Sequence, residues 1–195
     1  MVKKLNLLNL LLVFILCICI ILIFLENGFF IQGFAVEGDV YSNVTISKYL
    51  SIEFSPELSN GIVFGNVTFL PVISINASEN YGGSSDSSNY YIQVSSDGNT
   101  AVDFCINANV ALTNQYLDVL GLDNETYSCS NESNLSLPSL SGETPLTLGF
   151  VKCGESIAPS SNNYYRFWLD IPAAQPSGDY NNTLSFKGLS SGVSC

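Results

Sequence analysis

Residues 163–171, with the sequence NYYRFWLDI, indicate the fold class of this chain more clearly than any other stretch. Two sets of side chains alternate there, which is the period-two pattern of a β-strand. One face carries Tyr165, Phe167, Leu169 and Ile171, and the other carries Tyr164, Arg166, Trp168 and Asp170. We therefore predict a strand whose first face packs into an apolar core.

The same alternation recurs along most of the chain and predicts about seven short strands. Besides 163–171, the predicted strands span 40–54, 62–70, 90–94, 100–110, 145–152 and 180–189. The Asp97-Gly98 pair predicts a hairpin turn between two of them, and only 115–122 has a helical pattern. Short strands separated by turn residues predict an all-β fold, an immunoglobulin-like or jelly-roll-type β-sandwich.

An apolar run from Leu10 to Leu25 follows Lys3 and Lys4, which predicts an N-terminal hydrophobic helix and export of the residues after it. Two interpretations stay open, because the run is long for a signal peptide and short for a membrane anchor. Gly33-Phe34-Ala35 is a small-x-small site that allows cleavage after Ala35. We thus expect a signal peptide or membrane anchor at 1–35 and a single extracellular domain at 36–195, secreted or anchored at the cell surface.

The charge balance limits the partners of this chain. It has 6 basic and 17 acidic residues and a net charge of −11. Phosphate backbones and anionic lipid surfaces would repel such a chain. We expect no nucleic acid, membrane contact only through the N-terminal segment, and a protein partner (a second copy or a cell-surface protein) or a glycan.

Composition also argues against catalysis. The chain contains no histidine, the commonest general base and metal ligand. Gly188–Gly192 matches the G-x-S-x-G pattern, but a nucleophile elbow needs a following helix and a histidine. We predict no enzyme, no cofactor and no metal. The closest match to a calcium loop is Asp118, Asp123 and Glu125, whose alternative is a solvated acidic loop.

Four cysteines follow the leader, and none forms a C-x-x-C pair, so disulfides explain them better than zinc. Four cysteines allow three connectivities, and spacing does not choose among them. We expect Cys129 to join Cys153 across a sequon-rich loop, and Cys105 to join Cys195. Cys105 lies opposite the apolar face of its strand, which suits a bridge to a loop or terminus.

The chain carries seven Asn-x-Ser/Thr sequons, which predict a glycoprotein if the host glycosylates its surface proteins. Chance occurrence in an Asn- and Ser-rich chain is the alternative. We expect the polar stretch 124–134 to be an occupied loop. The sequons begin at Asn43, Asn66, Asn76, Asn124, Asn131, Asn134 and Asn181.

Tyr164, Arg166 and Trp168 form a stripe on the second face of 163–171. Arginine and aromatic residues are enriched at binding hot spots, and aromatic rings can stack on sugars, so we predict an interface there. The alternative is that a loop or the second sheet covers the stripe.

The stretch 164–186, YYRFWLDIPAAQPSGDYNNTLSF, resembles the closing hairpin of small exported archaeal surface proteins with sandwich folds. The likeness extends to 50–56, LSIEFSP, and to 61–67, GIVFGNV. A weaker likeness is to fibre subunits of the camelysin and TasA type and to thread-like pilus subunits. That resemblance implies polymerisation by lending an N-terminal strand, here Val36 to Ile46, to a neighbour.

Two functions follow as expectations. The first is a non-catalytic surface or secreted structural protein, a fibre subunit that assembles by strand donation. The alternative is an adhesin or carbohydrate-binding module that uses the Tyr164, Arg166 and Trp168 stripe.

Overall fold

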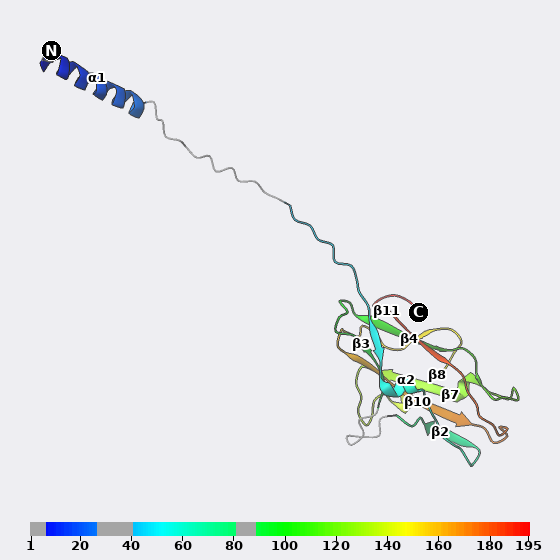
Figure 1. The fold of residues 1–195 in the computed structure, drawn as a ribbon. Coiled ribbons are helices and arrows are strands. Elements are labelled where there is room, and N and C mark those ends of the chain that lie inside the picture. Colours follow the sequence, from blue (N-terminus) through cyan, green and yellow to red (C-terminus); the bar gives the residue numbers. More distant parts are fainter. Residues whose placement is uncertain (1–6, 27–40, 81–88) are drawn as a thin grey trace. The chain divides into compact units, whose positions relative to one another are not determined.

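Strand β10 (Asn162–Ile171) is the central strand of the larger sheet in the computed structural model, which describes residues 7–26, 41–80 and 89–195 (Figure 1). One edge of β10 pairs with β7, and its other edge pairs first with β3 and then with β2. All pairs in this six-stranded sheet are antiparallel. Its remaining strands are β1 (Ile52–Phe54), β2 (Val72–Asn76), β3 (Tyr90–Val94), β7 (Glu125–Ser130) and β8 (Thr144–Pro145).

A second sheet has three strands in the order β11-β4-β9. They are β11 (Leu184–Ser190), β4 (Val102–Ala108) and β9 (Val151–Lys152). A separate small pair is formed by β5 (Leu112–Thr113) and β6 (Val119–Leu120). The short helical elements of this part are α2 (Pro56–Asn60), η1 (Leu122–Asn124) and η2 (Leu140–Gly142).

The two sheets pack face to face around one core, which confirms the predicted all-β sandwich. The core combines side chains of β3, β7 and β10 with those of β4, whose Val102, Phe104, Ile106 and Ala108 are buried as their alternation predicts. Phe186 of β11 makes edge-to-face ring contacts with Tyr165 (5.3 Å) and Phe54 (5.6 Å). These contacts join the sheets at favourable aromatic geometry.

The chain divides into two structural units, Met1–Thr45 and Ile46–Cys195. The first contains helix α1 (Leu7–Glu26), the predicted apolar helix, and its side chains from Leu10 to Ile23 are exposed. Within the part of the chain that the structure describes, no helix combines the length and apolarity needed to cross a membrane. The expected cleavage site after Ala35 lies outside the described residues.

Three predicted strands are wrong in whole or in part. Of 145–152, only Pro145 and Val151–Lys152 lie in strands, β8 and β9, which belong to different sheets. Of 40–54, only Ile52–Phe54 forms a strand, because β3 pairs with those three residues alone. Residues 61–68 contain no strand, although Ile62 and Phe64 pack against the core. Apolar alternation positions side chains, but a strand also needs a backbone partner.

Two predicted connections are also corrected. The turn at Asp97-Gly98 does not close a hairpin, because β3 and β4 belong to different sheets. The resemblance at 164–186 implied a closing hairpin, but β10 and β11 likewise lie in different sheets. Residues 115–122 form turns and the short strand β6 rather than a helix.

Helix α2 directs the chain away from the sheet after β1. Ser55 caps it by accepting a hydrogen bond from the Leu58 N–H (3.1 Å), and Pro56 begins it. Gly61 ends it with φ of +101°, a conformation that side chains with Cβ rarely adopt. Residues 61–68 therefore leave α2 as an irregular segment along the side of the sandwich.

Candidate functional site

A groove of about 930 Å³ opens on the side of the sandwich. One wall is segment 61–68, and the other is connection 175–183 with the first residues of β11. The lining is more apolar than polar, and its apolar side chains include Ile62, Phe64, Val67, Leu112, Leu169 and Leu184. Grooves of this kind are the usual binding sites of globular proteins.

The groove stays open because its two walls are not joined by strand pairing. Between residues 62 and 70, the described backbone makes one hydrogen bond to other backbone, from the Ser78 N–H to the Val63 carbonyl (2.8 Å). On the far wall, β11 is the edge strand of its sheet and pairs with β4. A small apolar cluster of Leu112, Leu120 and Leu169 also lines the groove.

The free edge of β11 faces this opening. In an antiparallel pair, residues alternate between those that exchange hydrogen bonds with the partner and those that point away from it. Bonds from Asn109 N–H to the Thr183 carbonyl and from Ser191 N–H to the Ala101 carbonyl (2.9 and 3.0 Å) set that alternation. The backbone groups of Leu184 and Phe186 therefore point away from β4, and both residues line the groove.

Glu125 is the buried charged group of the groove. It begins β7, is 3% exposed and lines the groove. Asn182 Nδ2 donates a hydrogen bond to its Oε2 (2.7 Å), and no basic side chain of the described residues forms an ion pair with it. Burial raises the pKa of the Glu125 carboxyl to about 7, and the Asn182 hydrogen bond opposes that rise only in part.

Residues 41–49 carry apolar side chains that nothing in the described chain covers. Tyr41, Val44 and Ile46 are 88%, 81% and 79% exposed, and 41–49 has no regular secondary structure. Asn99 holds the end of this segment, because it donates to the Ser47 carbonyl (2.9 Å) and accepts from the Tyr49 N–H (2.7 Å). Side chains 42, 44, 46 and 48 share one face of an extended chain, so Val44 and Ile46 point the same way.

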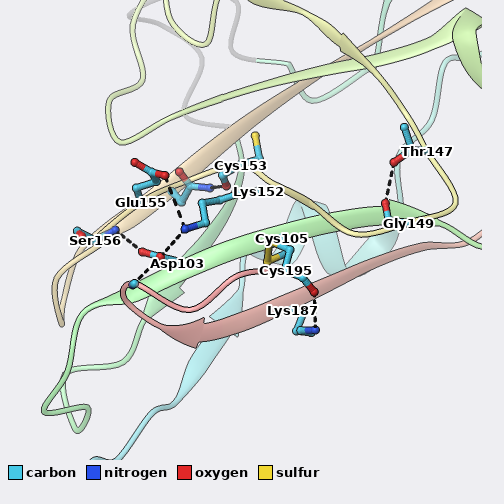
Figure 2. Close-up of a disulfide and its surroundings, with 12 residues drawn as sticks. Asp103, Cys105, Thr147, Gly149, Lys152, Cys153, Glu155, Ser156, Lys187 and Cys195 are labelled. Carbon is cyan, nitrogen blue, oxygen red and sulfur yellow. Dashed lines mark hydrogen bonds and ion pairs between the residues drawn. A yellow bond between two sulfur atoms is a disulfide. The ribbon is translucent and has the colours of Figure 1, made fainter.

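The opposite end of β4 has a second buried carboxyl, that of Asp103 (Figure 2). Its oxygens accept hydrogen bonds from Lys152 Nζ (2.8 Å), the Ser156 N–H (2.8 Å) and the Gly192 N–H (2.9 Å). Burial by itself raises the pKa of Asp103, but these donors outweigh it and hold the pKa well below its usual range. Asp103 thus ties the C-terminal tail and the loop after β9 to β4.

Both predicted disulfides are present. Cys105 bonds to Cys195 near Asp103 (Figure 2). Cys129 bonds to Cys153. Cys105 lies on the outer face of β4, as its position in the alternation indicates, and it is completely buried. Two disulfides are typical of a protein from an oxidising compartment.

The predicted interface stripe is not a surface. Arg166 is 8% exposed and Trp168 is 3% exposed. The Arg166 guanidinium donates to the carbonyls of Pro138 (3.0 Å) and Asn134, and Trp168 Nε1 donates to Asn76 Oδ1 (2.8 Å). The 134–138 loop therefore covers Arg166 and Asn76 of β2 contacts Trp168, whereas Tyr164 is partly exposed, so the predicted stripe is not a continuous exposed surface.

The three acidic residues considered for calcium have separate partners. Asp118 Oδ2 accepts from Asn114 (2.9 Å), Asp123 Oδ1 accepts from Asn124 (3.3 Å), and Glu125 accepts from Asn182. In the described residues, no group of three acidic or cysteine side chains is placed to hold a metal ion.

The sequon asparagines lie mostly at the surface, which glycosylation requires. Asn124 is half-buried, and the other six are exposed. Asn66 and Asn181 line opposite walls of the groove. The predicted loop at 124–134 is wrong in part, because Glu125–Ser130 forms strand β7. The occupancy of the sequons stays a prediction.

Sequence reasoning missed the groove and the Asp103 cluster. The groove walls come from segments more than a hundred residues apart, so no local pattern marks them. Asp103 is a charged residue within a strongly apolar strand, and a charged residue in that position indicates a buried, paired carboxyl. No protein-family model matches the chain, and a search of curated proteins found no match.

Proposed function

We propose that this chain is a non-catalytic extracellular structural protein whose copies polymerise by strand donation. The donor segment is Val36 to Ile46, of which residues 41–46 are described, and the acceptor is the groove beside β11. The observation that carries the proposal is that the chain has both a free sheet edge and an exposed segment that could pair with such an edge. A sheet edge opens onto an apolar groove, and an exposed segment of the same chain alternates apolar side chains.

Energetics support this pairing. Covering Val44 and Ile46 would contribute ~1.5 to 3 kcal/mol each. Each backbone hydrogen bond to the β11 edge would add ~0.5 to 1.5 kcal/mol. Together, several such contributions exceed the free energy that a single exposed contact supplies. Every copy carries both a donor segment and an acceptor groove, so the contact is head-to-tail and open-ended.

The proposal includes export of the residues that follow the N-terminal apolar helix. Support comes from the apolar run after Lys3 and Lys4, the two disulfides and the exposed sequons. Removal of the leader after Ala35 would free the N-terminus of the donor segment. Intact mass of the secreted protein reports this cleavage, the disulfides and any attached sugar together.

The test is negative-stain microscopy of the secreted protein. We expect threads from the native chain and none from the Val44→Asp/Ile46→Asp variant, because two charges cannot enter an apolar groove unpaired. The matched control is Tyr41→Asp/Ser47→Asp, which adds the same charges to the opposite face and leaves the Asn43 sequon intact. Threads should persist in that control. Monodisperse monomers of the native, leader-cleaved protein at high concentration would refute the proposal.

A further inference from the structure

Within the part of the chain that the structure describes, neither Glu125 nor Lys48 forms a pair with an opposite charge. Glu125 lines the groove and makes no ion pair with the described residues, and Lys48 forms neither a hydrogen bond nor an ion pair with them. The other basic residues of the sandwich are occupied. Lys152 binds Asp103, Lys187 donates to the Cys195 carbonyl, and Arg166 donates to loop carbonyls.

Lys48 lies on the same side of the donated chain as the residues proposed to enter the groove. Val44, Ile46 and Lys48 are two residues apart, so an extended chain presents all three on one face. Asn99 fastens the residues on either side of Lys48 to their own domain. Lys48 therefore sits where the donor segment leaves one sandwich.

Strand pairing brings these residues together in one register. If Ile46 of one copy lies opposite Leu184 of the next in an antiparallel pair, then Val44 lies opposite Phe186 and Lys48 opposite Asn182. Leu184 and Phe186 are the edge residues that line the groove. Asn182 is the residue whose amide binds the Glu125 carboxyl (2.7 Å). This register thus sets an ammonium group beside a buried carboxyl.

We propose that Glu125 is a register-setting site for strand donation, which binds the Lys48 ammonium of a second copy. This inference rests on the proposed function and names the residue pair that selects one alignment. Alternation alone allows slips by two residues, because such slips keep apolar side chains inward. A charge pair in a largely water-excluded groove penalises every slipped register, since each leaves the carboxyl unpaired.

The experiment measures binding of a fluorescent peptide of residues 41–49, YSNVTISKY, to the secreted chain carrying Val44→Asp/Ile46→Asp. That variant keeps its groove but cannot donate. Fluorescence anisotropy at pH 8 compares the native peptide with its Lys48→Met form. We expect the native peptide to bind about tenfold more tightly.

Two acceptor variants separate a specific pair from general attraction to an acidic protein. Glu125→Gln keeps a carbonyl oxygen for Asn182 and should abolish the difference between the peptides. Asp179→Asn removes an exposed charge from the same groove and should preserve it. Thermal unfolding of both variants checks that they fold.

The possible failures are distinguishable. If both peptides bind equally to the acceptor with Glu125, or if the lysine advantage survives Glu125→Gln, the charge pair is wrong and strand donation stands. If neither peptide binds any folded acceptor, strand donation itself fails, and the pairing of Lys48 with Glu125 fails with it.

Discussion

The Asp103 corner, where Asp103 contacts Lys152, Ser156 and Gly192, and the groove each bury a carboxyl group. Asp103 is 2% exposed and Glu125 is 3% exposed, yet the pKa of Asp103 is lowered and that of Glu125 is raised. Asp103 accepts hydrogen bonds from one ammonium and two backbone N–H groups. Glu125 accepts one hydrogen bond, from an amide. The donors of Asp103 outweigh its burial and lower its pKa, whereas burial outweighs the single donor of Glu125 and raises its pKa.

The two regions differ in whether the chain itself supplies bonding partners for their polar groups. In the Asp103 corner, the chain supplies every partner and then closes the site with its own C-terminal tail and a disulfide. In the groove, a sheet edge and an apolar surface lack partners from the described chain, and the Glu125 carboxyl has an amide partner but no basic one. The Asp103 corner is completed within one chain, whereas the groove is where we propose that a second copy binds.

The largest expected effect comes from opening the closed corner at its disulfide. The Cys105→Ser/Cys195→Ser variant should lose about 4 to 5 kcal/mol of unfolding free energy, because Cys105–Cys195 spans 90 residues and restricts the unfolded chain. Urea titration measures it. Cys129→Ser/Cys153→Ser is the comparison, because its shorter span of 24 residues predicts a smaller loss, about 3 to 4 kcal/mol. A larger loss of unfolding free energy from the Cys129→Ser/Cys153→Ser variant would contradict the proposal that the disulfide to the C-terminal tail contributes more to stability.

A smaller loss is expected when the corner carboxyl is replaced. Asp103→Asn should cost about 2 to 3 kcal/mol at pH 7, less than a fully buried pair, since Lys152 is 30% exposed. Because the folded-state pKa of Asp103 is lowered, its contribution is present above the unfolded pKa near 3.8 and is lost as pH falls through the folded pKa. Denaturant titrations at pH 7 and at acid pH should therefore converge for the two proteins.

The control for that variant is Glu155→Gln, which removes an exposed carboxyl 3.7 Å from the same ammonium. It should change stability by less than about 0.5 kcal/mol. An equal loss from both variants would mean that the Lys152 charge, and not the Asp103 hydrogen bonds, stabilises the corner.

The comparison predicts an effect of opposite sign in the groove. The folded-state pKa of Glu125 is raised from 4.5 to about 7, so the folded state binds more protons, and its stability falls as pH rises through that interval. Glu125→Gln cannot ionise and should be more stable than the native chain by on the order of 2 to 3 kcal/mol at pH 8. At pH 4 the two should be nearly equal.

The non-donating chain, Val44→Asp/Ile46→Asp, is the background for that measurement, because polymerisation would itself stabilise the groove. Urea titrations from pH 4 to pH 8 give the two pH profiles. Parallel profiles would show that Glu125 is not held in a water-poor site.

Much of the sandwich was predictable because strong alternation is a local property. β10, β3 and β4 lie where their patterns predict, and Cys105 faces outward toward its bond with Cys195. Segment 61–68 shows the limit of such a pattern. Its alternation places Ile62 and Phe64 against the core, but no backbone partner makes it a strand.

The candidate site was less predictable. Glu125 stood out in the sequence as a calcium candidate, and Val36 to Ile46 as a donor segment, but nothing local showed the groove that Glu125 lines. The Tyr164, Arg166 and Trp168 stripe was correct as one face of a strand and wrong as a surface, because alternation does not report what lies over a face.

By itself, the sequence determined the fold class, the apolar faces of the strongest strands, the apolar N-terminal helix and an acidic chain without histidine. These depend on neighbouring residues or on composition. Only the tertiary structure decided the sheet to which each strand belongs and the covering of Arg166. It also decided that the pKa of Asp103 is lowered and that of Glu125 is raised. Each of those depends on partners distant in sequence, such as Asn182, 57 residues from Glu125, and the three-dimensional fold alone brings such partners into contact.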